Sequence, residues 1–149
     1  MARPDLADEL EAQYKKAQRH GAEVVLALER IDESTFRPGI IKVEEGNPIL
    51  KEELFGPLAI LMIGKNDDDI LKLANDIPFG LGNAVWTKDK TRAQFFIENL
   101  ESGTVSVNKS TSSDVRLPFG GAKASGYGVE LSLHAIKEFT QIKTVVGNI

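Results

Sequence analysis

Residues 58–70, which read LAILMIGKNDDDI, indicate the fold class. Residues 58–63 are an unbroken apolar run of strand length, which is typical of a buried strand. Asn66 follows as a helix N-cap, and the aspartates at 67–69 fall in the first helical turn, where negative charge suits the helix dipole. The aspartates could instead suggest a metal site, but their place at a helix N-terminus explains them better. The segment predicts a buried strand followed by a helix.

The same alternation continues on both sides of this segment. Helices are expected over residues 4–20, from Asn66 to before Pro78, from Thr87 or Asp89 to Leu100, and over 130–138. Strands are expected over residues 23–28, 40–43, 58–63, 83–86, 104–107 and 140–146, with a long glycine-rich loop over 108–128. Alternation of this kind predicts an α/β fold with a largely parallel sheet flanked by helices, and with a C-terminal edge strand.

Composition limits the class of protein. The 149 residues suit one domain, and the hydrophobic and charged fractions of 42% and 27% are those of a soluble globular protein. No apolar run approaches the ~20 residues that cross a bilayer, and the first residues lack a signal-like pattern, so no membrane association is expected and a cytoplasmic location is expected. A net charge of −4 argues against a nucleic-acid partner.

The chain has no cysteine, which excludes disulfides, thiolate metal sites and a cysteine nucleophile. His20 and His134 lie far apart in the sequence, so no metal site is expected. The G-x-S-x-G, H-E-x-x-H and Walker A motifs are absent. Glycine pairs at 80–82 and 126–128 begin like a dinucleotide fingerprint, but neither is completed. Spacing alone therefore indicates a soluble α/β domain with one glycine-rich loop.

Three motifs, in order, resemble those of the aldehyde dehydrogenase superfamily. Residues 52–57 read EELFGP and are similar to the family's E-E-[IL]-F-G-P motif. Residues 73–76 and 78–81, LAND and PFGL, resemble its L-A-N-x-x-x-[FY]-G-L segment. Residues 117–128, LPFGGAKASGYG, resemble its P-F-G-G-x-K-x-S-G-x-G loop. The version at 113–121, SDVRLPFGG, looks most like the succinate-semialdehyde dehydrogenase group.

The resemblance implies binding roles for four residues. Glu53 matches the glutamate that hydrogen-bonds the nicotinamide ribose, a role that suits an ionised acceptor, and Phe55 matches the phenylalanine beside the nicotinamide. Phe119 matches an aromatic wall of the aldehyde tunnel, and Ser113 matches the loop position that lines the substrate mouth. Without the motif, Glu53 would be interpreted as a solvated charge. Phe119 could also anchor the glycine-rich loop in a core.

The resemblance also implies that the catalytic groups are missing. Family enzymes attack the aldehyde with a cysteine, pass hydride to NAD or NADP and hydrolyse the thioester with a glutamate-activated water. Those groups and the nucleotide-binding domain lie upstream of the matched segment in the family. We therefore expect residues 1–139 to be a partial catalytic domain that begins in mid-domain, with no catalytic residue. The chain alone is expected to be inactive and to bind the cofactor weakly or not at all.

Partners are implied by the last residues. Residues 140–146 resemble the tail strand that the family adds to a neighbouring subunit's sheet, so residues 140–149 are expected to be an oligomerisation tail of a homo-oligomer. A separate N-terminal dehydrogenase chain could complete the enzyme. Alternatively, the chain is a non-enzymatic oligomerising or regulatory subunit that pairs with a full-length or N-terminal dehydrogenase chain, or a decayed reading frame without a role of its own.

Overall fold

The computed structural model describes residues 1–148, which form two compact units. The first unit is Met1–Leu73, and the second begins at Ala74. Both units combine helices with strands, so the expected α/β class is confirmed. The described strands form small sheets that contain parallel and antiparallel pairs. The expected boundary at residue 139 stays a prediction.

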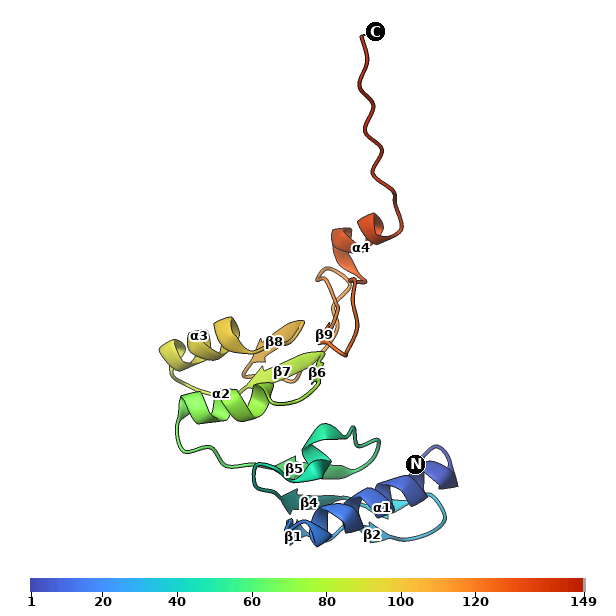
Figure 1. The fold of residues 1–149 in the computed structure, drawn as a ribbon, viewed down its shortest axis with the longest axis vertical. Helices are drawn as coiled ribbons and strands as arrows, with labels where there is room; N and C mark the ends of the chain where they lie inside the picture. The colour runs from blue at the N-terminus through green and yellow to red at the C-terminus, as the bar shows by residue number, and fades with distance from the viewer. Residues whose placement is uncertain (149) are drawn as a thin grey trace. The chain divides into compact units, whose positions relative to one another are not determined.

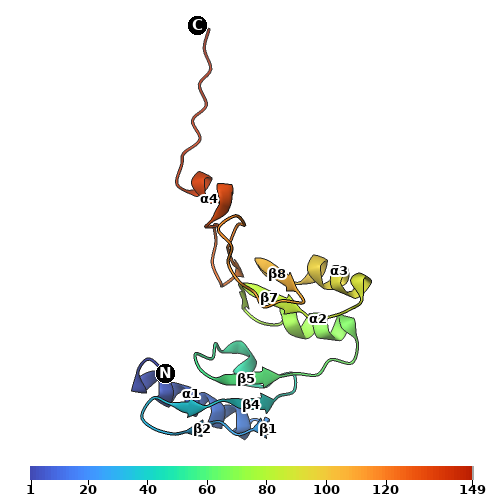
Figure 2. The ribbon, with the colours of Figure 1, turned by 180° about the vertical axis from the view of Figure 1, so that it is seen from behind.

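The first unit is a helix packed on a three-stranded sheet (Figure 1). Its elements are α1 (Pro4–Arg19), β1 (Glu23–Leu26), β2 (Glu29–Arg30), β3 (Phe36–Arg37), β4 (Gly39–Lys42), the short 3-10 helix η1 (Pro48–Lys51) and β5 (Leu58–Leu61). The strand order is β1-β4-β5, which Figure 2 shows from behind. β1 pairs antiparallel with β4, whereas β4 and β5 run parallel, as expected for strands joined by a long crossover.

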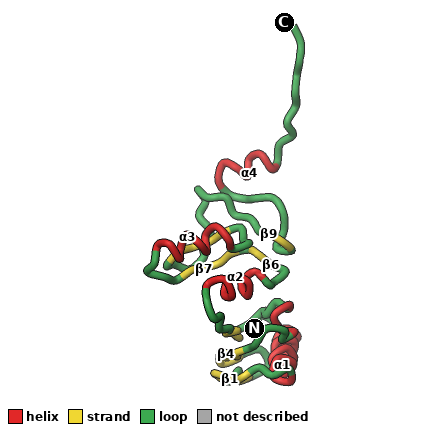
Figure 3. The backbone as a smooth tube through the Cα atoms, turned by 60° about the vertical axis from the view of Figure 1, so that its left-hand side comes forward, coloured by secondary structure: helices red, strands yellow, loops and turns green. Residues whose placement is uncertain are grey.

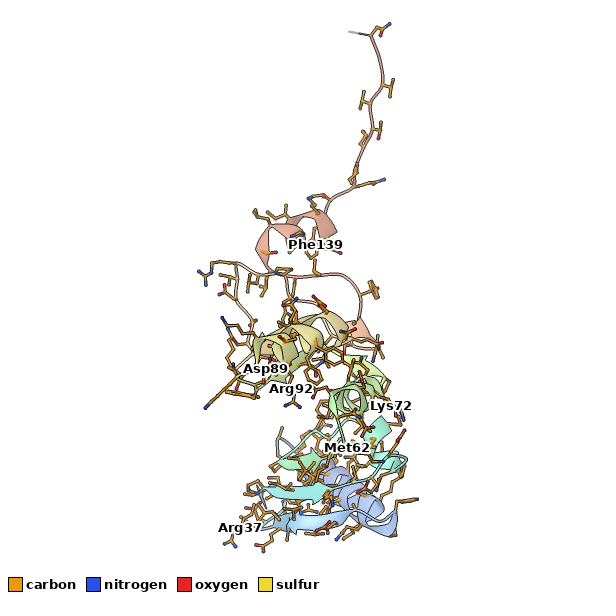
Figure 4. All side chains as sticks on the ribbon, turned by 90° about the vertical axis from the view of Figure 1, so that its left-hand side faces the viewer. Arg37, Met62, Lys72, Asp89, Arg92 and Phe139 are labelled. Carbon is orange, nitrogen blue, oxygen red and sulfur yellow. The ribbon has the colours of Figure 1, made fainter. Side chains whose placement is uncertain are left out.

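The core of the first unit lies between α1 and one face of this sheet. Leu10, Tyr14 and Ala17 recur at helical spacing on α1 and are buried against Ile41 of β4 and Leu58 of β5. Figure 3 shows α1 along one side of β1 and β4. Met62, labelled in Figure 4, packs against the same core from the end of β5. The apolar spacing of residues 4–20 thus determines which side of α1 packs on the sheet.

The described part of the second unit contains one parallel and one antiparallel pair of short strands, two helices and a long loop. Its elements are β6 (Phe79–Gly80), β7 (Gly82–Val85), α3 (Lys90–Asn99), β8 (Thr104–Val107), β9 (Ala122–Lys123) and α4 (Ser132–Glu138), while α2 (Asp67–Asn75) spans the boundary between the units. β7 pairs parallel with β8, and β6 pairs antiparallel with β9. No helix within residues 1–148 is both long and apolar enough to cross a membrane.

Side chains cap two of the expected helices. Asn66 accepts a hydrogen bond from the backbone N–H of Asp69 at 2.9 Å, as expected for the N-cap of α2. Asp89 is the N-cap of α3, because its carboxylate accepts from the N–H groups of Thr91 at 2.8 Å and Arg92 at 3.1 Å (Figure 4). Of the two expected caps for α3, Asp89 is therefore the one that the structure uses.

Four features differ from the expectation. No strand was expected over residues 29–38, but β2 pairs antiparallel with β3 there. Residues 108–128 are not all loop, since β9 forms a two-residue pair with β6, too short to leave an alternating pattern in the sequence. The helix expected over 130–138 begins only at Ser132, because Glu130 pairs its backbone with Phe119. Residues 140–148 form no strand in this chain, since a strand needs a hydrogen-bonded partner and these residues are exposed. The C-terminal edge strand stays a prediction.

Candidate functional site

The segment that carries Glu53 and Phe55 follows η1, and a buried amide fixes where η1 begins. Asn47 is 7% exposed, and its side-chain oxygen accepts from the N–H of Ile49 at 3.1 Å. Its side-chain amide donates to the carbonyls of Ala17 and His20 at the end of α1, both at 3.2 Å. One side chain thus binds two carbonyls at the C-terminus of α1 and caps the start of η1, which leads into residues 52–57.

Two polar side chains of α1 hold the segment itself. Gln13, which is 9% exposed, donates its side-chain amide to the carboxylate of Glu52 at 3.1 Å and to the backbone carbonyl of Glu53 at 3.4 Å. Lys16 donates to the other carboxylate oxygen of Glu52. The hydrogen bond from Lys16 is the main reason why the pKa of Glu52 lies below its usual range, and Gln13 lowers it further. Glu52 is therefore a structural carboxylate, held ionised against α1.

Gly56 allows the segment to approach α1 closely. A Cβ atom at position 56 would collide with the side chain of Leu10, which is 1% exposed. Because Leu10 is part of the packed core, it cannot move aside without disturbing that core. Glycine at position 56 is therefore required by packing.

Glu53 and Phe55 point away from this anchored backbone. Phe55 is 65% exposed, which is unusual for a large aromatic side chain, and Glu53 is also exposed. Within residues 1–148, the Glu53 carboxylate has no hydrogen-bond or ion-pair partner. The free Glu53 carboxylate can accept hydrogen bonds from sugar hydroxyls, and the exposed Phe55 ring beside it can stack on a flat heterocycle. These residues therefore fit the ribose and nicotinamide end of the cofactor.

The glycine-rich loop of the second unit is anchored by Lys123. The Lys123 ammonium donates to the carbonyls of Asn75 at 2.6 Å and Ile77 at 3.3 Å, and it pairs with the Glu101 carboxylate at 2.7 Å. The Ser125 hydroxyl accepts from the N–H of Gly80 at 2.9 Å. The motif at 73–81 and the motif at 117–128 are thus joined by direct contacts.

Phe119 lies at a cavity beside this loop. Its backbone exchanges two hydrogen bonds with Glu130, each of 2.8 Å. The cavity has a volume of about 420 Å³, and its walls come from the glycine-rich loop and from the end of α4. The lining includes Phe119, Gly120, Gly121, Tyr127, Glu138 and Phe139. Phe119 is half-buried, so it contributes both to the wall of the cavity and to the packing of the loop.

Ser113 lies on the same loop but does not line this cavity. Its side chain is exposed and precedes a tight turn closed by Asp114, whose carboxylate accepts from the backbone N–H and the guanidinium of Arg116. These bonds lower the pKa of Asp114 to about 2, the side-chain bond from Arg116 being the larger cause. The turn fixes the backbone one residue after Ser113 and keeps a carboxylate and a guanidinium together at the surface.

The four expected residues thus fall into two groups. Glu53 and Phe55 share a segment of the first unit, whereas Ser113 and Phe119 belong to the loop of the second unit.

The sequence reasoning missed several residues that position the site. It passed over Gln13, although a polar residue beside Leu10 and Tyr14 on the inner face of α1 signals a buried hydrogen bond. It also missed Asn47 and Lys123, whose partners lie too far away in the sequence to be identified from it. Within the described part of the chain, no group of three or more acidic or histidine side chains could hold a metal ion.

Comparison with known proteins identifies a family for this arrangement. The family model described as "Aldehyde dehydrogenase family" matches residues 1–145. Succinate-semialdehyde dehydrogenase (NADP+) of Mycobacterium leprae is 40% identical over 144 residues, which cover 92% of this chain and 31% of that protein. Succinate semialdehyde dehydrogenase (NAD(P)+) of Escherichia coli is 40% identical over 148 residues, which cover 97% of this chain and 32% of that protein.

A solved structure gives the same result. Succinic semialdehyde dehydrogenase from Streptococcus pyogenes, in complex with NADP+ as the cofactor, aligns with a TM-score of 0.89 at 32% identity. The alignment covers 99% of this chain and 33% of the other. The chain therefore spans about a third of the length of the relatives it matches.

Proposed function

The chain belongs to the aldehyde dehydrogenase family, and we propose that it is the C-terminal part of an NAD(P)-dependent enzyme that oxidises an aldehyde to a carboxylic acid. The observation that carries the proposal is the match over residues 1–145, together with succinate-semialdehyde dehydrogenase relatives at about 40% identity. Succinate semialdehyde is the candidate substrate, because relatives named succinate-semialdehyde dehydrogenase resemble the chain along almost its whole length.

The proposed cofactor contacts are those of Glu53 and Phe55. When bound, NAD or NADP supplies the acceptor for the hydride that leaves the aldehyde carbon. The Glu53 carboxylate would accept hydrogen bonds from the ribose hydroxyls, and Phe55 would pack beside the nicotinamide ring. Gln13 and Lys16 support this role, since Gln13 holds the Glu53 backbone and Lys16 holds the Glu52 carboxylate, while the Glu53 carboxylate stays free. For the isolated chain we propose weak binding or none, because one end of the cofactor alone makes few contacts.

The proposed substrate contacts are those of the second unit. Phe119 would form an aromatic wall of the aldehyde tunnel, and its place at the cavity supports that role. Ser113 would line the mouth of the tunnel, where its exposed hydroxyl could donate to the far carboxylate of a semialdehyde.

We propose that this chain is inactive by itself, because it has no cysteine to attack the aldehyde. A second chain with the nucleophile, the glutamate base and the nucleotide-binding domain would complete the enzyme. In the complete protein, the parallel pair β4-β5 and the parallel pair β7-β8 would each belong to a largely parallel sheet. Residues 140–146 would pair with a neighbouring copy, which agrees with the 92% exposure of Ile142 and the 93% exposure of Val146.

An absorbance assay tests the proposed function. The purified chain should not reduce NAD or NADP with succinate semialdehyde. Mixed with the part of the E. coli relative that lies outside the matched segment, it should restore aldehyde-dependent absorbance at the wavelength of the reduced cofactor. Steady activity of the chain alone would contradict the proposed inactivity. A mixture that forms a complex without activity would favour the second candidate, a non-enzymatic oligomerising or regulatory subunit, which the exposed C-terminal residues would also suit.

A further inference from the structure

The sheet of the first unit has an apolar face that α1 does not cover. Successive side chains of a strand point to opposite faces, so the neighbours of the buried Ile41 and Leu58 point away from α1. Ile40 and Ala59 are two of these neighbours, and they pair with each other. Leu26 of β1 pairs with Ile40, and Leu61 follows Ala59 by two residues and so lies on the same face. We call Leu26, Ile40, Ala59 and Leu61 the open sheet face.

The exposure of these side chains is large for a sheet. Leu26 is 50% exposed and Leu61 is 42% exposed, and Ile63, just beyond β5, is 68% exposed. A single exposed aliphatic residue needs no explanation, but a contiguous row across three strands does. At one end, Lys42 pairs with Glu23 at 3.4 Å, which gives the open sheet face a charged rim.

The pattern of β5 is that of a strand buried on both faces. Residues 58–63 are apolar without interruption, and β5 runs parallel to β4. Sheets with parallel strands normally have both faces covered, whereas a sheet with one face in water alternates apolar and polar residues. In residues 1–73, α1 covers one face only (Figure 3). A second layer is therefore missing from this unit.

The size of the open sheet face fits a helix. Neighbouring strands lie about 4.8 Å apart, so the outer two of three strands are separated by roughly the 10 Å diameter of an α-helix. The relatives supply a source for that helix, because about two thirds of their chains lie outside the segment matched by this protein. A second copy of this chain would instead bring another exposed sheet with its charged rim.

We infer that the open sheet face is the docking surface for the apolar side of a helix in the polypeptide that completes the dehydrogenase. The inference rests on the proposed function, since it takes the partner to be the chain that supplies the nucleophile. Docking buries Leu26, Ile40, Ala59 and Leu61 and leaves the Lys42–Glu23 pair at the edge of the interface.

Thiol labelling tests this surface directly, because the chain has no cysteine of its own. Ala59→Cys places a thiol on the open sheet face, and Ile31→Cys is the matched control, since Ile31 is 59% exposed between β2 and β3. The probe is the part of the E. coli relative outside the matched segment, at about ten times its dissociation constant. The rate of labelling is measured from the mass of this chain. The rate for A59C should fall roughly tenfold when the probe is added, whereas the rate for I31C should stay unchanged.

A charge on the surface gives a second measurement. Leu61→Glu should weaken the complex roughly tenfold or more, because docking would bury an unpaired carboxylate, whereas Ile31→Glu should bind within about twofold of the unmodified chain. Circular dichroism of both variants checks that they remain folded. If L61E unfolds, the A59C measurement alone decides.

The outcomes separate the surface from the function. Protection of A59C without aldehyde-dependent cofactor reduction supports the docking surface and contradicts the proposed function. Activity with A59C unprotected contradicts the surface and supports the function. A mixture that forms no complex overturns the inference. If labelling of A59C in this chain alone slows as the chain's concentration rises, a second copy covers the open sheet face. That result would also overturn the inference.

Discussion

The side-chain amide of Gln13 donates to the backbone carbonyl of Glu53 across 40 residues of chain. The same amide also contacts Glu52, so one buried group of α1 holds two consecutive residues of the segment proposed to contact the cofactor. The backbone of Glu53 is thus set by the core, while its carboxylate remains free. A residue whose backbone is already fixed and whose carboxylate is free loses little conformational entropy when it binds a ligand.

Removing this amide should loosen the segment. Gln13→Ala leaves the Glu53 carbonyl and one Glu52 oxygen without their donor, so unfolding should become easier by about 1 to 2 kcal/mol. Hydrogen exchange should accelerate at the amides of residues 53–55. Gln18→Ala is the control, since Gln18 is exposed on the same helix. Equal exchange in Q13A and Q18A would show that the amide does not fix the segment.

The Lys16–Glu52 pair should make stability depend on pH. The pKa of Glu52 is lowered in the folded chain, mainly by the hydrogen bond from Lys16. Its contribution is therefore present above the ordinary carboxyl range and is lost as the pH falls through the lowered value. Glu52→Gln should lower the melting temperature at neutral pH, by an amount that corresponds to less than about 1 kcal/mol because the pair is partly exposed. As the pH falls below the ordinary carboxyl range, the difference should shrink. Thermal melts at neutral and acidic pH check it, with Glu44→Gln, at an exposed position, as the control variant.

Several helices and strands were predicted correctly because residues close together in the sequence determine them. The spacing of Leu10, Tyr14 and Ala17 predicted α1 and its buried side, and Asn66 was correctly interpreted as a cap. The apolar run at 58–63 predicted β5 as a buried strand, and in the structure Leu58 is buried, whereas Ala59 and Leu61 are exposed.

Non-local contacts account for the features that the sequence did not predict. β9 exists because its two residues meet β6, more than 40 residues earlier, and neither strand is long enough to show a period. The late start of α4 depends on the backbone pair between Phe119 and Glu130. At the candidate site, the motif predicted Glu53 and Phe55, but the anchors Gln13 and Asn47 act through partners 27 to 40 residues away.

Lys123 should control the order of the glycine-rich loop. Lys123→Met keeps the length of the side chain but removes the donors to the Asn75 and Ile77 carbonyls and the partner of Glu101. We expect a loss of about 1 to 3 kcal/mol in the stability of the second unit, because two carbonyls and a carboxylate lose their charged donor. Limited proteolysis should then cut within residues 119–128 faster than in the unmodified chain. Lys88→Met, at an exposed position, should leave the cleavage pattern unchanged.

At position 131, a glycine variant should be more stable than an alanine variant, which is the reverse of the usual order. The φ of 63° and ψ of 173° of Leu131 place it in a backbone region that is essentially restricted to glycine. Any residue with a Cβ atom is strained there, and the strain persists because Phe119 and Glu130 fix the preceding backbone while Ser132 donates to the carbonyl of Val115. Leu131→Ala removes the half-buried side chain without relieving this strain, whereas Leu131→Gly removes both.

The comparison of these two variants cancels the lost packing, which is the same in each. L131G should therefore be more stable than L131A by about 1 to 2 kcal/mol, although glycine normally costs roughly 0.5 to 1 kcal/mol relative to alanine through the entropy of the unfolded chain. Chemical denaturation of both proteins measures the difference. The same pair of substitutions at Leu133, which is 80% exposed within α4, should give the ordinary order, with alanine the more stable. If position 131 also followed the ordinary order, its backbone would not be strained.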